Sequence, residues 1–241
     1  MHHKNAMVRP ASGHPVVDGL PRGQLVAVVV LALLAILLTA AARGGETLPG
    51  DVLLARWVQS APELIGKGIG WLGYWIGSAP IVVGFGAILA GALWWRGETR
   101  LAAFTVALLL LRALNPLLKL AIASPRPDAE AVVVSELADG YGFPSGHVMG
   151  AVLIYGGVIW IAQRAIHRPV VRHIIQTIAV MLIFITGIGR VVTGAHWPSD
   201  VLGGVLWGTV ALLTLTIIAE RWTWPQRLDT KRPTRTSRPI F

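Results

Sequence analysis

Two polar segments of this chain carry side chains that could attack, hold and release an electrophilic group. In GIGRVVTGAHWPSD (187–200), His196 is followed four residues later by Asp200. An aspartate at that spacing can hold one ring nitrogen of the histidine, which leaves the other free as a nucleophile or base. In GFPSGHVMG (142–150), His147 could then protonate the departing oxygen. This division of labour fits phosphoryl transfer.

Three basic residues in the same parts of the chain suggest what these histidines would act on. Lys119 and Arg126 precede the segment 142–150, and Arg190 lies within the segment 187–200. Cations gathered without an equal number of carboxylates predict an anion site, and the guanidinium fork suits phosphate oxygens. Each of these residues alone would more simply be an interfacial or snorkelling side chain, so the prediction rests on their joint occurrence.

Ser145 and Gly146 stand where a polar loop meets a long apolar run. At a helix start, free backbone N–H groups and the positive end of the helix dipole favour an anion, and glycine allows a close backbone approach. The alternative is a simple helix start with the serine as N-cap. Asn115, one helical turn before Lys119, is a candidate for orienting that lysine.

These residues must be positioned by membrane helices. The composition is 54% hydrophobic and 14% charged, with a mean hydropathy of +0.63, which is too apolar for a soluble domain of 241 residues. Without cysteines the chain has no thiolate site or disulfide framework. Runs of about 20 apolar residues can each cross a bilayer as a helix. Six such runs predict an all-α bundle of six transmembrane helices: 24–42, 74–95, 101–119, 146–163, 174–192 and 200–219.

Two details of this layout need comment. The first run follows basic residues and ends in small ones, as a signal peptide would, but its length favours a retained helix. Residues 49–73 alternate apolar and polar side chains at helical spacing, which predicts a short interfacial amphipathic helix between the first two spans.

The distribution of Lys and Arg predicts the orientation. The formal net charge is +9, and most of the 21 basic residues fall on one side if the amino terminus is cytoplasmic. The positive-inside tendency then places both termini in the cytoplasm and the two polar segments outside. We divide the chain into a cytoplasmic tail (1–23), a membrane domain (24–219) and a basic tail (220–241) that binds the membrane surface rather than nucleic acid.

Three segments together resemble the signature motifs of the type 2 phosphatidic acid phosphatase (PAP2) superfamily of membrane lipid phosphatases. They are Lys119-x6-Arg126-Pro127, Pro144-Ser145-Gly146-His147 and Arg190-x5-His196-x3-Asp200. The resemblance extends over residues 24–219. It implies that His196 is a nucleophile forming a phosphohistidine, that Asp200 orients it, and that His147 is the general acid. It also implies that Lys119, Arg126, Ser145, Gly146 and Arg190 bind phosphate, with no metal or cofactor.

By this resemblance the chain is expected to be a multi-pass phosphatase of the cytoplasmic membrane, metal-independent, with its site outside. It would hydrolyse a lipid phosphomonoester or pyrophosphate drawn from the bilayer: polyprenyl pyrophosphate, phosphatidic acid or phosphatidylglycerol phosphate. Two alternatives stay open, a lipid phosphotransferase with the same site and a silent lipid-binding or transport protein. One position departs from the pattern: Gly189 stands where the third motif usually has serine, which predicts weakened or retuned phosphate binding.

Overall fold

The computed structural model describes residues 22–221. The segments 1–21 and 222–241, which hold nearly all of the two predicted tails, lie outside the described residues. The first described helix begins at Arg22 and the last ends at Arg221, and the division into two tails and a membrane domain stays a prediction.

From residue 22 to residue 221 the chain consists of helices and loops, without a strand. This agrees with the predicted all-α class. The helices are α1 (Arg22–Ala42), α2 (Asp51–Gln59), α3 (Glu63–Gly77), α4 (Ala79–Trp95), α5 (Thr99–Ala113), α6 (Asn115–Ile122), α7 (Gly146–Ala165), α8 (Pro169–Val192) and α9 (Pro198–Arg221).

Five segments of the described chain are long and apolar enough to cross a membrane, and a sixth arises if α3 and α4 form one span bent by 47°. One of the five combines α5 with α6, which are separated at Leu114, two residues before Pro116. Proline lacks a backbone N–H and restricts the residue before it, which explains the break. The chain is thus a multi-helix membrane protein.

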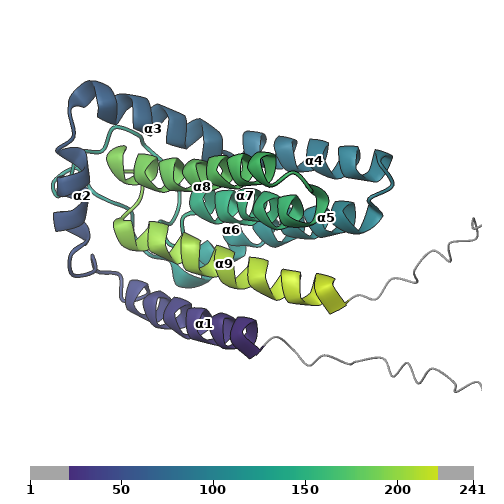
Figure 1. Ribbon diagram of the computed structural model, residues 1–241. Helices are drawn as coiled ribbons and strands as arrows, with labels where there is room; N and C mark the ends of the chain where they lie inside the picture. The colour runs from purple at the N-terminus through teal and green to yellow at the C-terminus, as the bar shows by residue number, and fades with distance from the viewer. Residues whose placement is uncertain (1–21, 222–241) are drawn as a thin grey trace, which may run out of the picture.

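The stretch predicted as one amphipathic helix is divided in the structure. Residues 51–59 form α2, which lies across the end of the bundle (Figure 1), and a turn ending at Pro62 separates it from α3. Residues 63–73, assigned by sequence to that helix, instead begin the long α3. Apolar spacing alone did not distinguish an interfacial helix from one whose glycines pack inside the bundle.

Helix α7 forms the centre of the bundle. It packs against α5, α8 and α9, while α3 lies on α8 and α1 lies on α9 (Figure 1). Small residues bring α9 close to α7: a Cβ added at Gly204 would lie 2.8 Å from the carbonyl oxygen of Ser145. Close helix approach through glycine is usual in membranes, where packing replaces the hydrophobic driving force.

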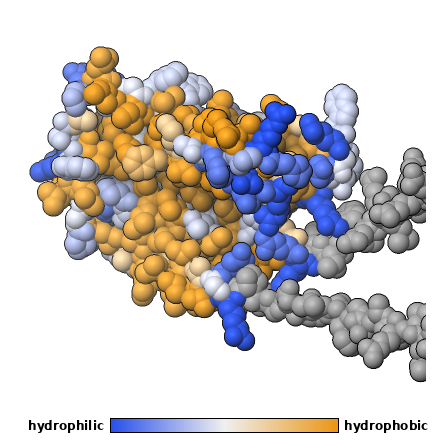
Figure 2. Space-filling view, in the orientation of Figure 1, coloured by the Kyte–Doolittle hydropathy of each residue, from blue (hydrophilic) through white to orange (hydrophobic). Residues whose placement is uncertain are grey.

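The two ends of the bundle differ in character. One carries α2, the end of α8 and the start of α9, and the other carries the start of α1 and the end of α9 (Figure 1). Hydrophilic side chains gather at the second end, whereas the body between is largely apolar (Figure 2). The predicted site residues all belong to the first end.

Candidate active site

The polar loop 123–145 and the short turn 193–197 lie at the α2 end of the bundle and hold Arg126, Ser145 and His196, while the other predicted site residues lie in the helices that these segments join. Gly194 makes the turn possible, with a φ of 67° in the left-handed region that favours glycine. The turn is closed by a hydrogen bond from the backbone N–H of His196 to the carbonyl oxygen of Arg190, at 3.2 Å. Residues from α6, α7, α8 and α9 are therefore brought to one place.

His196 and Asp200 form the pair that their spacing predicts. Nδ1 of His196 lies 3.2 Å from Oδ2 of Asp200, and the two side chains are 2% and 1% exposed. The same Oδ2 accepts a hydrogen bond of 3.0 Å from the backbone N–H of Trp197. Its burial and these two contacts hold the Asp200 carboxylate in place, and the carboxylate in turn orients the His196 ring.

Arg126 determines which nitrogen of that ring carries the proton. Its Nη1 lies 3.4 Å from Nε2 of His196, and a guanidinium can only donate. Nε2 must then accept, so the proton is on Nδ1 and points to Asp200. Nε2 is left with its lone pair directed into the site, which is the state a nucleophile requires.

The surroundings keep His196 neutral. Burial, and then the positive charges of Lys119 and Arg126, hold the pKa of His196 well below its ordinary value of 6.5. A histidine in this environment does not lose its lone pair to a proton near neutral pH.

Lys119 and Arg126 also shape the loop above them. Lys119 donates to the carbonyl oxygen of Tyr141 at 2.8 Å. Arg126 donates to the carbonyl oxygens of Asp139, Gly140 and Ala195 at 2.9, 2.9 and 2.7 Å. Lys119 thereby joins α6 to the loop 123–145, and Arg126 joins the loop to the turn that carries His196.

Arg190 is fully buried, and its guanidinium binds a carboxylate in two places. Nη1 and Nη2 lie 2.7 and 2.6 Å from the two carboxylate oxygens of Glu136. No local pattern in the sequence marks Glu136 for this role, because its partner lies 54 residues away. A two-oxygen anion thus already occupies Arg190, in the geometry that phosphate oxygens would use.

Ser145 is the N-cap residue of α7, but its side chain makes no capping hydrogen bond. Its Oγ is buried without a partner, so the hydroxyl remains available. Asn115 lies beside this helix start, 3.4 Å from the carbonyl oxygen of Pro144 and 3.5 Å from the sulfur of Met149. A Cβ on Gly146 would meet the Asn115 Oδ1 at 2.6 Å, so a larger residue here would displace the Asn115 side chain. Asn115 therefore contacts the α7 start, whereas its predicted role toward Lys119 stays a prediction.

His147 faces an aromatic residue that sequence reasoning missed. Its ring centroid lies 5.6 Å from that of Tyr74 on α3, and its Nε2 is buried without a hydrogen-bond partner. The Arg190 guanidinium lies over the same tyrosine, 5.6 Å from the ring centroid. Tyr74 thus contacts both the general-acid candidate and a phosphate-binding candidate, and no sequence motif marks it.

Helix α2 contacts the start of α9, next to the site. Both carboxylate oxygens of Asp51 accept hydrogen bonds from Ser199, one from its backbone N–H at 2.8 Å and one from its hydroxyl at 2.6 Å. Ser199 precedes Asp200, so α2 holds the first turn of α9. This link across 148 residues has no signal in the sequence.

Gly189 lies at the crossing of α8 with α3. A Cβ there would come within 2.8 Å of the Ile69 carbonyl oxygen and 2.9 Å of the Gly73 Cα. The position therefore faces the backbone of α3, and close packing of the two helices explains why glycine stands here in place of serine.

A sequence model of the PAP2 superfamily matches residues 100–224, more than half of the chain and all of the predicted site. The chain therefore belongs to the PAP2 superfamily. The match begins in α5, so α1 to α4, including Asp51 and Tyr74, lie outside it.

Curated proteins similar to this PAP2 chain include two bacterial phosphatases and a human one. Phosphatidylglycerophosphatase B of Bacillus subtilis is 34% identical over 96 residues, 39% of this chain and 45% of that protein. Its Escherichia coli counterpart is 35% identical over 82 residues, 31% and 28% of the two chains. Human sphingosine-1-phosphate phosphatase 2 is 36% identical over 111 residues, 45% and 27%. The chain thus spans less than half the length of these relatives.

Two solved structures share the PAP2 fold. The crystal structure of a transmembrane PAP2 type phosphatidylglycerolphosphate phosphatase from B. subtilis has a TM-score of 0.70 at 22% identity, covering 83% of this chain and 98% of the other. That of Aquifex aeolicus LpxE has a TM-score of 0.55 at 22% identity, covering 73% and 98%. At 22% identity, both similarities are evidence of a shared fold.

Proposed function

We propose that this protein is a lipid phosphatase that hydrolyses a phosphomonoester or pyrophosphate at the outer face of the cytoplasmic membrane through a phosphohistidine. The observation that carries the proposal is the orientation of His196, with Nδ1 toward Asp200 and Nε2 toward Arg126. This arrangement prepares one nitrogen for attack among cations that neutralise a phosphate.

In the first half-reaction, Nε2 of His196 attacks phosphorus and the bond from phosphorus to the leaving oxygen breaks. The Asp200 carboxylate, which accepts the hydrogen bond from Nδ1–H, stabilises the positive charge that develops on the ring. His147 donates its proton to the leaving oxygen, and its unpartnered Nε2 suits that role. The alcohol, or the shorter phosphate ester, departs.

In the second half-reaction, water attacks the phosphohistidine and His147 accepts the proton of that water. The bond from nitrogen to phosphorus breaks, inorganic phosphate leaves, and His196 regains its lone pair. Lys119, Arg126 and Arg190 stabilise the equatorial oxygens in both steps, together with the Ser145 hydroxyl and the N–H groups at the start of α7, where Gly146 lies.

Substrate binding requires a change at Arg190, because Glu136 holds both of its outer nitrogens. A phosphate carrying two negative charges competes for the guanidinium better than one carboxylate. Glu136 is partly exposed at 24%, so it can turn to solvent when displaced.

The orientation follows from the charges of the described residues. A series of arginines lies at the helix ends opposite the site: Arg22, Arg96, Arg100, Arg164, Arg168, Arg172 and Arg221. The positive-inside tendency puts that end in the cytoplasm and the site outside. Six spans, with α3 and α4 crossing as one bent unit and α2 at the interface, are consistent with this orientation, as are cytoplasmic tails at 1–23 and 220–241.

Three substrates are candidates: polyprenyl pyrophosphate, phosphatidic acid and phosphatidylglycerol phosphate. Each combines a phosphate for the cationic site with a tail that stays in the bilayer. The names of the bacterial relatives favour phosphatidylglycerol phosphate as the first to test.

The test is release of inorganic phosphate by the purified full chain in detergent with EDTA, with the three lipids offered in parallel. His196→Ala is expected to abolish release without loss of the fold. His173→Ala is the matched control, because His173 is an exposed histidine in the first half of α8, away from the site. Labelled phosphate should be trapped on the wild-type protein by rapid quenching.

Each negative outcome has a defined meaning. Near-normal turnover by His196→Ala would refute the nucleophile. Consumption of substrate with a phosphorylated acceptor in place of free phosphate would favour the phosphotransferase. Binding of all three lipids without turnover, by folded protein, would favour the silent binder.

A further inference from the structure

Arg112 is a basic residue inside a membrane span, and the mechanism proposed above does not use it. The span Thr99–Ile122 consists of α5 and α6, and Arg112 lies about 15 Å from its end at Ile122, at about 1.5 Å per residue. The Nε of Arg112 is buried without a hydrogen-bond partner, and within residues 22–221 its guanidinium has no ion pair. A charged side chain is costly at this depth unless it meets an opposite charge, so an unpaired one indicates a functional site.

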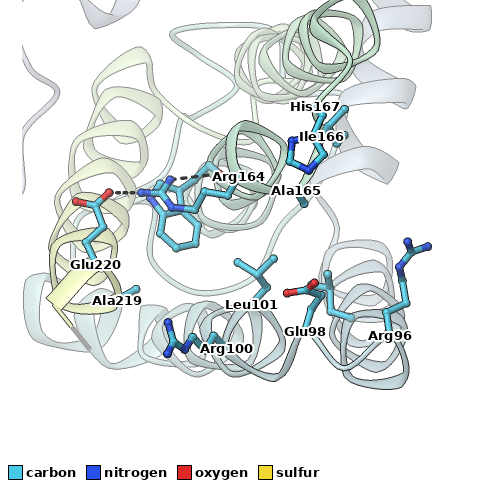
Figure 3. A pocket seen from close by; sticks show the side chains of 12 residues that line it. Arg96, Glu98, Arg100, Leu101, Arg164, Ala165, Ile166, His167, Ala219 and Glu220 are labelled. Atoms are coloured by element: carbon cyan, nitrogen blue, oxygen red, sulfur yellow. Dashed lines mark hydrogen bonds and ion pairs between the residues drawn. The ribbon is translucent and has the colours of Figure 1, made fainter. Parts of the chain in front are cut away.

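Other arginines of the described chain have carboxylate partners. Arg164 lies at a cavity at the opposite end of the bundle (Figure 3), where it forms an ion pair with Glu220. Arg190 binds both carboxylate oxygens of Glu136. Since Arg112 has no such partner from residue 22 to residue 221, a bound anion is the group that would complete it.

Arg112 begins a row of polar side chains that leads to the phosphate-binding candidates. Arg112, Asn115 and Lys119 are separated by three and four residues, a spacing that places side chains on one face of a helix. The two helices form one span despite their break at Leu114. The row therefore runs from Lys119 at the catalytic end toward the middle of the bundle.

Two glycines of α7 face this row. A Cβ added at Gly146 would lie 2.6 Å from Oδ1 of Asn115, and a Cβ added at Gly150 would lie 2.8 Å from Nε of Arg112. The two glycines are one helical turn apart, so α7 leaves room for both polar side chains. Arg112 thus lies against α7 rather than pointing into lipid.

The position of Arg112 along α7 relates it to the leaving group. His147, the proposed general acid, is three residues before Gly150, and side chains at this spacing are neighbours, with about 5–6 Å between Cβ atoms. Gly150 is also about 7.5 Å further along the helix than Ser145, whose backbone N–H donates to the carbonyl oxygen of Asp200. Arg112 therefore lies beyond the general acid, in the direction in which a lipid leaving group extends into the bilayer.

We propose, on the basis of the lipid phosphatase function proposed above, that Arg112 binds a second phosphate of the substrate on the leaving-group side. The terminal phosphate lies at His196, the leaving oxygen at His147 and the second phosphate at Arg112. Phosphatidylglycerol phosphate supplies this group as its phosphodiester, and polyprenyl pyrophosphate supplies it as the phosphate next to the prenyl chain. Phosphatidic acid has no second phosphate. The site thus selects substrates that carry two phosphates.

Steady-state hydrolysis by the purified full chain in detergent, with each of the three lipids, tests the proposal. Arg112→Met removes the charge and keeps an unbranched side chain. The ratio of kcat/KM for phosphatidylglycerol phosphate to that for phosphatidic acid should fall about tenfold to hundredfold in this variant, the usual contribution of a hydrogen bond to a charged group. The same ratio for polyprenyl pyrophosphate should fall too. Arg112→Lys, which keeps the charge and loses the planar fork, should lie between the variant and the wild type.

Arg168→Met is the matched control, because Arg168 is an exposed arginine at the opposite end of the bundle and its loss should leave both ratios unchanged. A second readout requires no turnover. Methylenediphosphonate, in which carbon joins two phosphonates, should protect the wild-type protein against heat at lower concentrations than methylphosphonate does. This preference should disappear in Arg112→Met.

Two results would overturn the proposal. The first is a substrate ratio that is the same in the wild type and in Arg112→Met. The second is an equal loss for all three lipids, which would indicate that Arg112 orients His147 instead of binding phosphate. Neither result would contradict the phosphatase function, because the wild type still turns over. If the wild type hydrolyses none of the lipids, the proposed function fails, and the phosphonate preference then decides for or against Arg112.

Discussion

Replacing Gly189 with alanine should push α8 away from α3. The added Cβ would lie 2.8 Å from the Ile69 carbonyl oxygen, whereas ordinary contacts begin at 3.4 Å, so the helices must separate by about 0.6 Å. The nearest atoms belong to the backbone and cannot rotate away. Overpacking of this kind costs about 1–3 kcal/mol, against a gain of up to about 1 kcal/mol in helix propensity. The net loss of unfolding free energy is therefore about 1–2 kcal/mol.

Thermal unfolding in detergent, followed by tryptophan fluorescence, measures this loss. For a chain of this size about 1–2 kcal/mol corresponds to a fall in Tm of about 2–8 °C. Gly68→Ala is the matched control, since Gly68 lies in α3, is exposed and would gain a Cβ with nothing within 4 Å. Its Tm should be unchanged or higher.

Activity should fall with stability, because Arg190 directly follows Gly189. A displacement of about 0.6 Å at α8 misplaces the guanidinium, and misplacement on the ångström scale can cost about 100-fold in rate, so we expect about a tenfold loss of kcat/KM. Gly189→Ser should behave in the same way and should not tighten phosphate binding. A Gly189→Ser variant with wild-type Tm and a lower KM would refute the packing explanation and restore the hydroxyl to the site.

Three other changes test the site. Glu136→Gln should lower KM about threefold to tenfold in steady-state kinetics. The partly exposed Glu136 carboxylate competes with substrate phosphate for Arg190, and its ion pair with Arg190 contributes about 1 kcal/mol. An unchanged KM would show that Glu136 does not compete. Asp51→Ala should reduce unfolding free energy by about 2 kcal/mol through its two lost hydrogen bonds to Ser199, and Asp51→Asn, which keeps one acceptor, by less; equal denaturation curves would contradict this. Since the pKa of His196 is lowered on folding, only the unfolded chain gains its proton as pH falls below about 6.5, so stability should decrease there, and less steeply in His196→Ala; parallel Tm–pH curves would contradict it.

The site residues that could be predicted from the sequence and those that could not differ in the distance along the chain to their contact partner. The contact between His196 and Asp200 follows from a spacing of four residues and could be expected from the chain alone. Glu136, by contrast, has its partner 54 residues away. Asp51 reaches its partner across 148 residues. Only the packing of distant helices creates such contacts, and no local pattern records it.

The helix boundaries illustrate the same limit. Hydropathy located the apolar runs, because burial in lipid demands them. It did not locate the start of α3 at Glu63, since glycines packing on α8 have little hydropathy signal in a stretch that also contains Glu63 and Lys67. The break between α5 and α6 was likewise hidden inside one apolar run.

The contacts of α9 have a consequence for how the protein is made. The backbone N–H of Ser145 donates to the carbonyl oxygen of Asp200, and Asp51 binds Ser199, so both earlier parts of the site close upon the start of this helix. Chains are synthesised from the amino terminus, and α9 enters the membrane after α1 to α8. Until it does, His196 lacks the Asp200 carboxylate that holds its ring. The candidate site is thus completed only at the end of membrane insertion, and we expect a nascent chain that has not yet inserted α9 to be inactive.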